Sequence, residues 1–225
     1  MRTADHMNLS RYIMDHMDAG ASKLQKAAFI FGSIELDINM LTYFRGSIRG
    51  EEKLRGHNYE NVMKYMEKLT KKLEKGGMGT VRQSFLLGKL VHYVADSFTY
   101  PHNSIFSGNL REHCQYETEL HDYVNQMISS DNVNLDSIDD GIDIVEYLEE
   151  IHYRYVSEAL GCENDYRHIT HSISVVTERF WQTESVSVPS MRDVAIACKE
   201  HIPVTANVSM AAAGQTGMDA HTRVA

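Results

Sequence analysis

The chain has 225 residues, a length that favours one sizeable hydrophobic core over several small domains. Its 22 basic and 31 acidic residues give a formal net charge of −9, so stable binding to a nucleic-acid backbone has no electrostatic support. Three cysteines, at positions 114, 162 and 198, lie far apart, which excludes a disulfide framework and a zinc ribbon. No stretch approaches the roughly 20 apolar residues that a membrane-spanning helix needs.

Apolar residues recur at helical spacing along almost the whole chain, as in Ile30, Ile34, Ile38 and Leu41, and the alternation typical of strands is scarce. Only three prolines occur and none precedes Pro101, so long segments lack helix breakers. The sequence therefore predicts an all-α fold. The expected helices cover residues 7–18, 21–42, 58–75, 79–99, 110–129, 137–160, 166–184 and 190–200.

Glycine-containing stretches at 46–56 and 76–79 and an acidic stretch at 131–140 are the expected connections between these helices. From residue 204 onward the chain is small and polar, with little to bury. We expect residues 1–203 to form one helical domain and residues 204–225 to form a mobile tail.

The segment from residue 90 to residue 102 carries the strongest chemical signal. His92 and Asp96 are four residues apart and therefore share one face of a helix. Pro101 ends this helix, which allows His102 to turn back toward the same site. His113 and Glu117 repeat the four-residue spacing on the next expected helix. Helices that present an imidazole and a carboxylate toward one another can build a polynuclear metal site.

The two histidine–acid pairs do not by themselves indicate a metal site. Only the whole pattern, with His102 between the pairs, is rare enough to indicate one. Two histidine–acid pairs at this spacing are about as many as chance gives in a chain with 12 histidines and 31 acidic residues. By themselves, His92 and Asp96 could form an ordinary ion pair on a helix face. A histidine ten residues after His92, followed by a second pair nearby, is much rarer, so the joint pattern predicts a metal centre.

In this order, the residues resemble the zinc-dependent phospholipases C, bacterial enzymes related to the P1/S1 nucleases. The similarity runs through Leu87-Gly88-Lys89-Leu90-Val91-His92-Tyr93-Val94-Ala95-Asp96, then Pro101-His102 and His113-x3-Glu117. It covers roughly residues 1–130. The resemblance implies a single multi-helix domain built around a trinuclear zinc site, with nitrogen and oxygen ligands that suit this metal.

The resemblance also implies the ligands of the first and second zinc ions. Asp37, His57, His92 and Asp96 would hold the first ion, and Asp37 would in addition orient or deprotonate the attacking water. The second ion would be held by the three remaining residues of the motif, His102, His113 and Glu117. From the residues alone, His57 follows a glycine at an expected helix start and could instead be a solvated capping residue.

The third zinc would be held by His6 and by the amine and carbonyl of Met1, with Asp96 bridging to the first ion. The resemblance thus implies three zinc ions, or two if the N-terminal site is lost. Members of the family begin with tryptophan, whereas this sequence begins with Met1.

Several alternatives remain open at these positions. Glu35 competes with Asp37, because both are acidic residues of one expected helix. His16 competes with His6, but it stands beside acidic residues in mid-helix, a pattern typical of a solvated side chain. His121 lies four residues after Glu117 on the same face, where a supporting or surface role is the simpler interpretation.

The function implied by the resemblance is zinc-dependent phosphodiester hydrolysis, with a phospholipid cleaved on the glycerol side of the phosphate. A P1/S1-type single-strand nuclease or 3′-nucleotidase is the alternative, but those enzymes usually end the motif in His-x3-Asp after a longer gap, so Glu117 favours the phospholipases. A metal-binding helical module without turnover is a second alternative. Expected partners are a phospholipid or other phosphodiester and, transiently, a membrane surface, with no stable binding to nucleic acid.

Polar residues follow Met1 where a signal peptide would be apolar. The sequence therefore predicts no leader and a cytoplasmic location, in contrast to the family, which is typically secreted.

Overall fold

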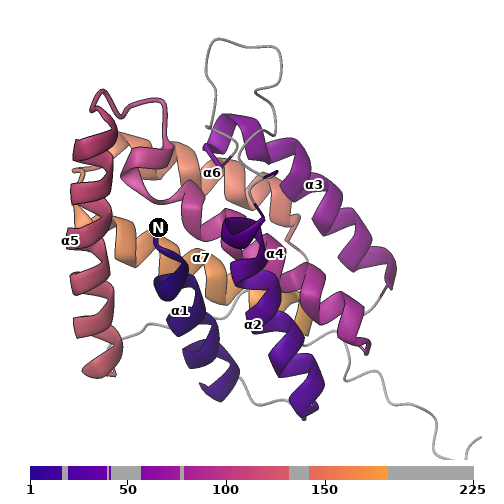
Figure 1. The fold of residues 1–225 in the computed structure, drawn as a ribbon. Coiled ribbons are helices and arrows are strands. Elements are labelled where there is room, and N and C mark those ends of the chain that lie inside the picture. The colour runs from indigo at the N-terminus through magenta and orange to yellow at the C-terminus, as the bar shows by residue number, and fades with distance from the viewer. Residues whose placement is uncertain (17–19, 40, 42–56, 77–78, 132–141, 182–225) are drawn as a thin grey trace, which may run out of the picture. The chain divides into compact units, whose positions relative to one another are not determined.

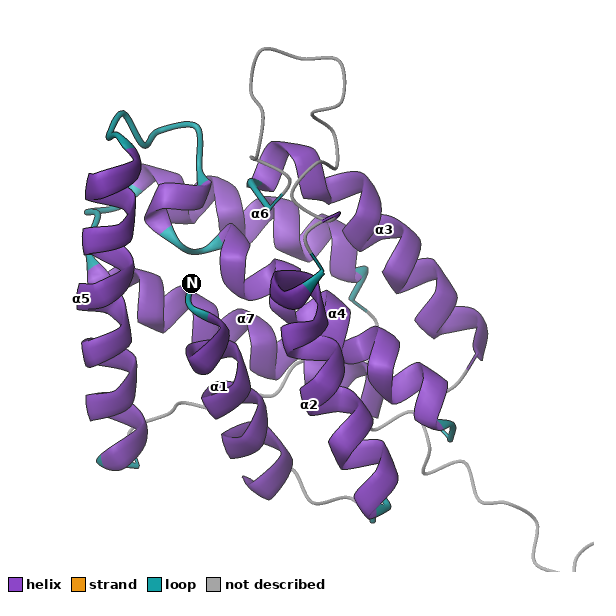
Figure 2. Cartoon of the chain, in the orientation of Figure 1, coloured by secondary structure: helices purple, strands orange, loops and turns teal. Residues whose placement is uncertain are grey.

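The computed structural model of the chain describes residues 1–16, 20–39, 41, 57–76, 79–131 and 142–181 (Figure 1). In these ranges the regular structure is helical and contains no strand (Figure 2), which confirms the all-α prediction. The helices are α1 (Thr3–His16), α2 (Lys23–Ile38), α3 (Tyr59–Gly76), α4 (Val81–Ser97), the short 3₁₀ helix η2 (Tyr100–His102), α5 (Leu110–Ser129), α6 (Ile144–Ser157) and α7 (Cys162–Trp181).

Several helices begin at residues other than the predicted ones, and the side chains near their first residues account for the difference. α1 begins at Thr3, four residues earlier than predicted, and a carboxylate oxygen of Asp5 accepts the Arg2 backbone N–H at 3.3 Å. α7 begins at Cys162, also four residues early, with acidic side chains in its first turn, where they suit the helix dipole. α6 begins at Ile144, where the side chain of Asp143 accepts two backbone N–H groups.

Other predicted elements lie partly or wholly outside the described residues. Wholly or largely outside are the helix at 190–200, the tail at 204–225 and the connections at 46–56 and 131–140, and partly outside are the connection at 76–79 and the predicted helices at 7–18, 21–42, 137–160 and 166–184. α2 ends at Ile38, before the predicted end at 42, with Asn39 as its cap. The predicted helix at 110–129 coincides with α5.

Helix α4 is the centre of the core, and it packs against α2, α3 and α7. Leu87, Leu90, Val91 and Val94 are buried around its circumference. A helix that is apolar on all sides belongs in the interior of a protein, so polar groups that α4 carries are buried with it. His92 and Asp96 are both 0% exposed. The sequence motif is thus part of the most buried helix of the described fold.

Two glycines let α2 approach α4 closely. A methyl group added at Gly32 would overlap the carbonyl of Phe85, and one added at Gly88 would overlap the carbonyl of Phe29. Both obstacles are backbone atoms, which cannot move aside as a flexible side chain can. The absence of a side chain at both positions therefore sets the distance between the helices that carry Asp37 and His92.

None of the described helices combines the length and the apolar character that crossing a membrane requires.

Candidate metal centre

Four side chains from three segments meet between α2 and α4, and we call them the inner group: Asp37, His57, His92 and Asp96. His57 Nδ1 lies 3.3 Å from His92 Nε2 and 3.1 Å from Asp96 Oδ2. His92 Nε2 lies 3.2 Å from Asp96 Oδ2. Asp37 Oδ1 completes the group at 3.8 Å from His57 Nδ1 and 3.6 Å from His92 Nε2.

These spacings match the shape of a zinc site. Four ligand atoms at 2.0–2.1 Å from a tetrahedral zinc ion lie about 3.3 Å from one another. The five distances measured within the inner group range from 3.1 to 3.8 Å. The ligand atoms of Asp37, His57 and His92 all lie within 4.8 Å of one another, and both histidines also approach Asp96 Oδ2, so these residues could hold a zinc ion.

A hydrogen bond on the side of the ring that faces away from the cluster fixes the orientation of His92. Its Nδ1–H donates to the carbonyl oxygen of Ser33 at 2.7 Å, which leaves the lone pair of Nε2 directed at Asp37 and Asp96. A backbone carbonyl in this position is the usual partner of a metal-binding histidine. Ser33 follows Gly32, so the close approach of α2 to α4 also supplies this hydrogen bond.

A second set of side chains lies next to the inner group, and we call it the outer group: His102 on η2 and His113 and Glu117 on α5. Glu117 Oε1 lies 3.2 Å from His113 Nε2 and 3.4 Å from His102 Nε2. The other ring nitrogen of His102, Nδ1, lies 3.4 Å from Asp96 Oδ2. As predicted, Pro101 belongs to the turn after α4 that brings His102 back to this site.

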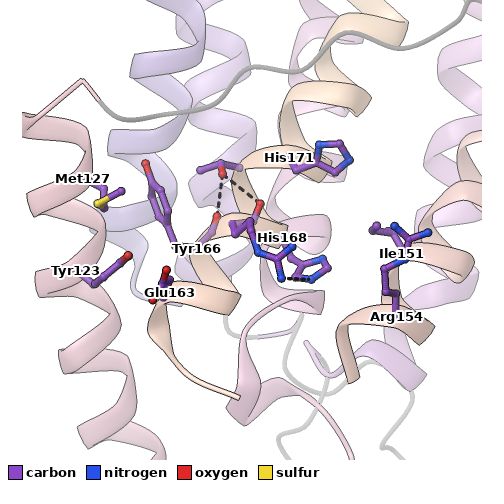
Figure 3. A pocket seen from close by; sticks show the side chains of 10 residues that line it. Tyr123, Met127, Ile151, Arg154, Glu163, Tyr166, His168 and His171 are labelled. Atoms are coloured by element: carbon purple, nitrogen blue, oxygen red, sulfur yellow. Dashed lines mark hydrogen bonds between the residues drawn. The ribbon is translucent and has the colours of Figure 1, made fainter. Parts of the chain in front are cut away.

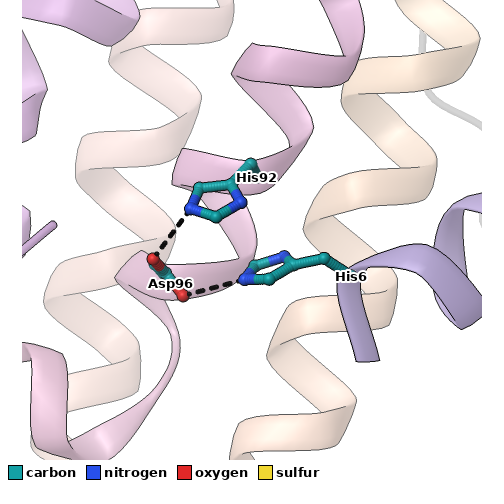
Figure 4. Close-up of side chains that lie close together, drawn as sticks. All are labelled: His6, His92 and Asp96. Atoms are coloured by element: carbon teal, nitrogen blue, oxygen red, sulfur yellow. Dashed lines mark ion pairs between the residues drawn. The ribbon is translucent and has the colours of Figure 1, made fainter. Parts of the chain in front are cut away.

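His6 and the Met1 amine complete the cluster on the Oδ1 side of Asp96. His6 Nε2 lies 3.2 Å and the Met1 nitrogen 3.1 Å from this oxygen. The Met1 nitrogen also lies 3.1 Å from Glu117 Oε1. Figure 4 shows His6 and His92 approaching the two oxygens of Asp96 from different helices. Asp96 is therefore the residue that joins the parts of the cluster, as a bridging ligand would.

Charges in the cluster balance one another. Burial would raise the pKa of Asp96, but His102, the Met1 amine and His92 outweigh it and hold that pKa well below its usual range. Burial opposes the charge of the Met1 amine, yet the attraction of Asp96 and Glu117 raises its pKa to about 11. Burial lowers the pKa of His57, which favours the neutral form that a metal ligand requires.

Two buried nitrogens further support a metal in this cluster. His6 Nε2 and His102 Nδ1 are buried and make no hydrogen bond of normal geometry, although each lies near Asp96. A buried polar atom without a hydrogen bond is costly, and a cation among these ligand atoms would satisfy it. Imidazole and carboxylate are also ligands that zinc accepts. The residues present therefore fit zinc.

The alternative ligand candidates that the sequence left open lie outside the groups that could hold a metal. Glu35 forms an ion pair with Lys89 at 2.8 Å and is absent from the described groups that could hold a metal. His16 is 43% exposed in its side chain and lies 3.6 Å from Asp131. His121 Nδ1 contacts the buried carboxylate of Asp5 at 2.5 Å, a contact that joins α5 to α1. His57 belongs to the cluster and is not a solvated cap.

One supporting residue was not predicted from the sequence. Asp165 on α7 is 0% exposed, and its Oδ2 accepts the backbone N–H of Tyr100 and the hydroxyl of Tyr116, both at 2.8 Å. Its Oδ1 accepts the hydroxyl of Tyr155, also at 2.8 Å. Tyr100 precedes His102 on η2 and Tyr116 precedes Glu117 on α5. Asp165 thus ties together the two segments that carry the outer group.

The metal-binding cluster opens into a pocket of about 560 Å³. Its wall includes members of both groups, together with uncharged residues and Arg2. The described lining residues are Met1, Arg2, Thr3, Asp37, His57, Asn58, His102, Leu110, His113, Cys114 and Glu117. Asp96 is not part of this wall, because it is buried beneath it.

A second pocket, of about 390 Å³, lies among α5, α6 and α7 (Figure 3). Tyr123, Met127, Ile151 and Tyr166 give it an apolar part. Among its described lining residues, Arg167 and His168 contact Glu158. No group of described residues that could hold a metal lies there.

The described residues form an all-α fold with several groups of nitrogen and oxygen side chains that could hold metal ions at the base of a pocket. A family model described as zinc dependent phospholipase C matches residues 5–162. This is well over half of the chain, which therefore belongs to that family of zinc-dependent phosphodiester hydrolases. The match confirms the resemblance and extends it past residue 130 to the start of α7. Neither a curated protein nor a solved structure gives a significant match.

Proposed function

We propose that this protein hydrolyses the glycerol-side phosphoester bond of a phospholipid, with release of diacylglycerol and a phosphorylated head group. The observation that carries the proposal is the pocket of about 560 Å³ whose wall contains ligand candidates of both the inner and the outer group. A phosphodiester in this pocket would face both groups at once.

The inner group would hold one zinc ion, the outer group a second, and Met1 with His6 and Asp96 a third. Zinc bound at such ligands acidifies a coordinated water toward neutral pH and neutralises the charge that develops on a phosphodiester during displacement. The acidic net charge of the chain is compatible with a phosphate substrate for this reason.

The two carboxylates of the inner group have different environments and therefore different roles. Asp96 is 0% exposed and lies beneath the pocket, so its role is to hold the cluster together. Asp37 lies at the pocket wall and can contact a water molecule that enters with the substrate. Asp37 would orient this water and accept its proton, as a general base within hydrogen-bond reach does.

The direct test is hydrolysis of bis-p-nitrophenyl phosphate and of short-chain phospholipids by the zinc-bound protein, with and without chelator. We expect activity that the chelator abolishes and zinc restores, and diacylglycerol as the lipid product. Phosphatidic acid as the product would place the cleavage on the other side of the phosphate. Zinc binding without any turnover would instead support a metal-binding module, and preferential cleavage of single-stranded nucleic acid would support a nuclease.

The role of Asp37 has a matched control on the same helix. Asp37→Asn should lower the turnover number by more than about 100-fold, a usual size for the loss of a general base. Glu35→Gln removes a carboxylate two residues away that pairs with Lys89, and should retain activity within a few-fold. Equal losses in the two variants would remove Asp37 from the proposed role.

The third ion depends on the amine of Met1, which lies 3.1 Å from both Asp96 and Glu117. An N-terminal extension would convert this amine into an amide, which is a poor metal ligand. The extended protein should therefore hold about one zinc ion fewer and turn over more slowly than protein whose free Met1 amine is verified by mass spectrometry. Identical metal content and rate would show that the centre uses two ions.

A further inference from the structure

Arg2 is a cation in the wall of the substrate pocket that the metal centre does not account for. It is half-buried and lines the pocket beside the outer group. A guanidinium is permanently charged and presents several donors in a planar fork, a shape that matches the oxygens of a phosphate. Its position beside the metal ligands, and not on an outer surface, is the first indication of a role in substrate binding.

The guanidinium of Arg2 makes no ion pair with a carboxylate in the described part of the chain. Its Nη2 donates to the hydroxyl oxygen of Thr118 on α5. That hydroxyl in turn donates to the carbonyl of Cys114 at 2.8 Å, so Thr118 is itself held in place. The nearby carboxylate of Asp5 accepts a hydrogen bond from the backbone N–H of Arg2 and not from its guanidinium. Arg2 is thus positioned by a neutral partner, and no carboxylate among the described residues forms an ion pair with its guanidinium.

The rest of the described wall offers nothing to a cationic head group. A quaternary ammonium group is normally bound by aromatic faces or by free carboxylates. The described lining contains no Phe, Tyr or Trp. Its two carboxylates, Asp37 and Glu117, belong to the groups that could hold metal ions. With the metal bound, the polar part of this wall would be dominated by positive charge.

An apolar rim accompanies this charge. Leu110, the first residue of α5, lines the pocket and is 77% exposed. An exposed leucine at the mouth of a pocket suits a substrate with an apolar portion, such as the acyl chains of a lipid.

We propose that Arg2 selects phospholipids whose head group carries a phosphate of its own, in addition to the phosphodiester that is cleaved, and disfavours quaternary ammonium head groups. This inference rests on the proposed phospholipase function. In such a substrate the zinc cluster contacts the phosphodiester, and the fork of Arg2 binds the second phosphate.

The test compares lipids that differ in one group. Dioctanoyl phosphatidylinositol 4-phosphate and dioctanoyl phosphatidylinositol share every atom except the added phosphate, and dioctanoyl phosphatidylcholine supplies the cationic head group. For the zinc-bound protein we expect kcat/KM for diacylglycerol release to be about tenfold higher with the phosphorylated lipid than with phosphatidylinositol, and lowest with phosphatidylcholine.

Variants at Arg2 should change this ratio through KM. Arg2→Gln keeps a donor for Thr118 but removes the charge, so the ratio of kcat/KM for the two inositol lipids should fall to near one. Arg2→Lys should retain part of the ratio. Arg11→Gln is the matched control, because Arg11 is exposed on α1, the helix that follows Arg2, and does not line the pocket.

A binding measurement separates this inference from the proposed function. Calorimetry with inositol 1,4-bisphosphate and zinc-bound protein should show roughly tenfold weaker binding to Arg2→Gln and unchanged binding to Arg11→Gln. If no lipid is hydrolysed but this difference holds, the phospholipase proposal fails and the anion site at Arg2 stands. A ratio near one in the wild-type protein, or equal ratios and equal binding in wild type and Arg2→Gln, would overturn the inference.

Discussion

The inner and outer groups of the metal centre are built from different kinds of structure. His92 and Asp96 of the inner group are 0% exposed, on a helix that is buried on all sides and held to α2 by the contact at Gly32 and Gly88. The side chains of His113 and Glu117 in the outer group are 27% and 19% exposed.

This difference shows how one cluster can combine a fixed part and an accessible part. The inner group is held in place by core packing, so its ligands cannot move unless the packed helices that carry them also move. The outer group depends on η2 and α5, which Asp165 joins through hydrogen bonds. Exchange of metal and contact with substrate are therefore expected at the outer group first, and each variant below tests that division.

Asp96 should give the largest effect, because it contacts both groups. Asp96→Asn removes charge from all the sites that share this carboxylate, whereas Glu117→Gln affects the outer group and the neighbouring Met1 amine but leaves the inner group intact. We expect Asp96→Asn to lose more zinc and to lower kcat/KM by well over 100-fold, and Glu117→Gln to lower it by about 10- to 100-fold. Metal analysis with steady-state kinetics measures both, and equal losses would contradict the bridging position of Asp96.

Gly88→Ala should disturb the inner group without touching a ligand. The added methyl group meets the backbone carbonyl of Phe29, so α2 and α4 must separate, at a cost of about 1–3 kcal/mol. Asp37 and Ser33 would move away from His92, and the zinc content should fall.

Gly76→Ala is the control for this variant. At Gly76 the three atoms nearest to the new methyl group belong to the end of the Gln83 side chain, which can rotate away, so unfolding temperature and zinc content should change little. Thermal unfolding and metal analysis of both variants test the comparison, and a stable Gly88→Ala protein with full zinc would refute the tight contact.

A graded chelator titration should remove zinc in two stages. The more exposed outer group should release its ion first with a small fall in melting temperature, and the inner group should follow with a larger fall, because its ligands are part of the core. Metal analysis and thermal unfolding at each chelator concentration follow both stages. Release in one step, or a metal-free protein with an unchanged melting temperature, would show that the two groups do not differ in this way.

The smallest expected effect concerns the support of the outer group. Burial raises the pKa of Asp165 to about 6, against an ordinary value of 3.8, although the hydrogen bonds from Tyr100, Tyr155 and Tyr116 oppose the shift. Because the folded-state pKa is raised, the stability that protonated Asp165 contributes is complete below about pH 4 and is lost as the pH rises through 6.

The unfolding free energy of wild type relative to Asp165→Asn should therefore fall by about 1 kcal/mol between pH 5 and pH 7. Denaturant unfolding of both proteins at several pH values measures this difference. Glu163→Gln, which also replaces an acidic residue by its amide on the first turn of the same helix, is the control variant. A difference between wild type and Asp165→Asn that stays constant with pH would refute the raised pKa.

Sequence reasoning located most of the helices and much of the cluster, for identifiable reasons. Helical periodicity and the scarcity of proline are local properties, and so is the spacing of His92, Asp96 and His102. The choice between Asp37 and Glu35 is not local, because both belong to α2 and the packing of α2 against α4 decides which one faces His92. Helix starts were missed where one capping contact, such as that of Asp5 with Arg2, sets them.

Asp165 shows the limit of such reasoning. It is one acidic residue in a segment without a motif, and only the folded chain brings it to Tyr100 and Tyr116. A buried acidic residue of this kind cannot be distinguished from a solvated one by spacing along the chain.

The position of Asp165 also bears on where the catalytic unit ends. The family match stops at residue 162, the first residue of α7, whereas the carboxylate that joins η2 to α5 comes three residues later. Truncation of the chain at the C-terminal edge of the recognisable similarity would keep every candidate ligand but would remove most of the helix that carries Asp165. We therefore expect a segment that keeps the outer group in place to extend into α7 as far as Asp165, beyond the part that sequence similarity marks out.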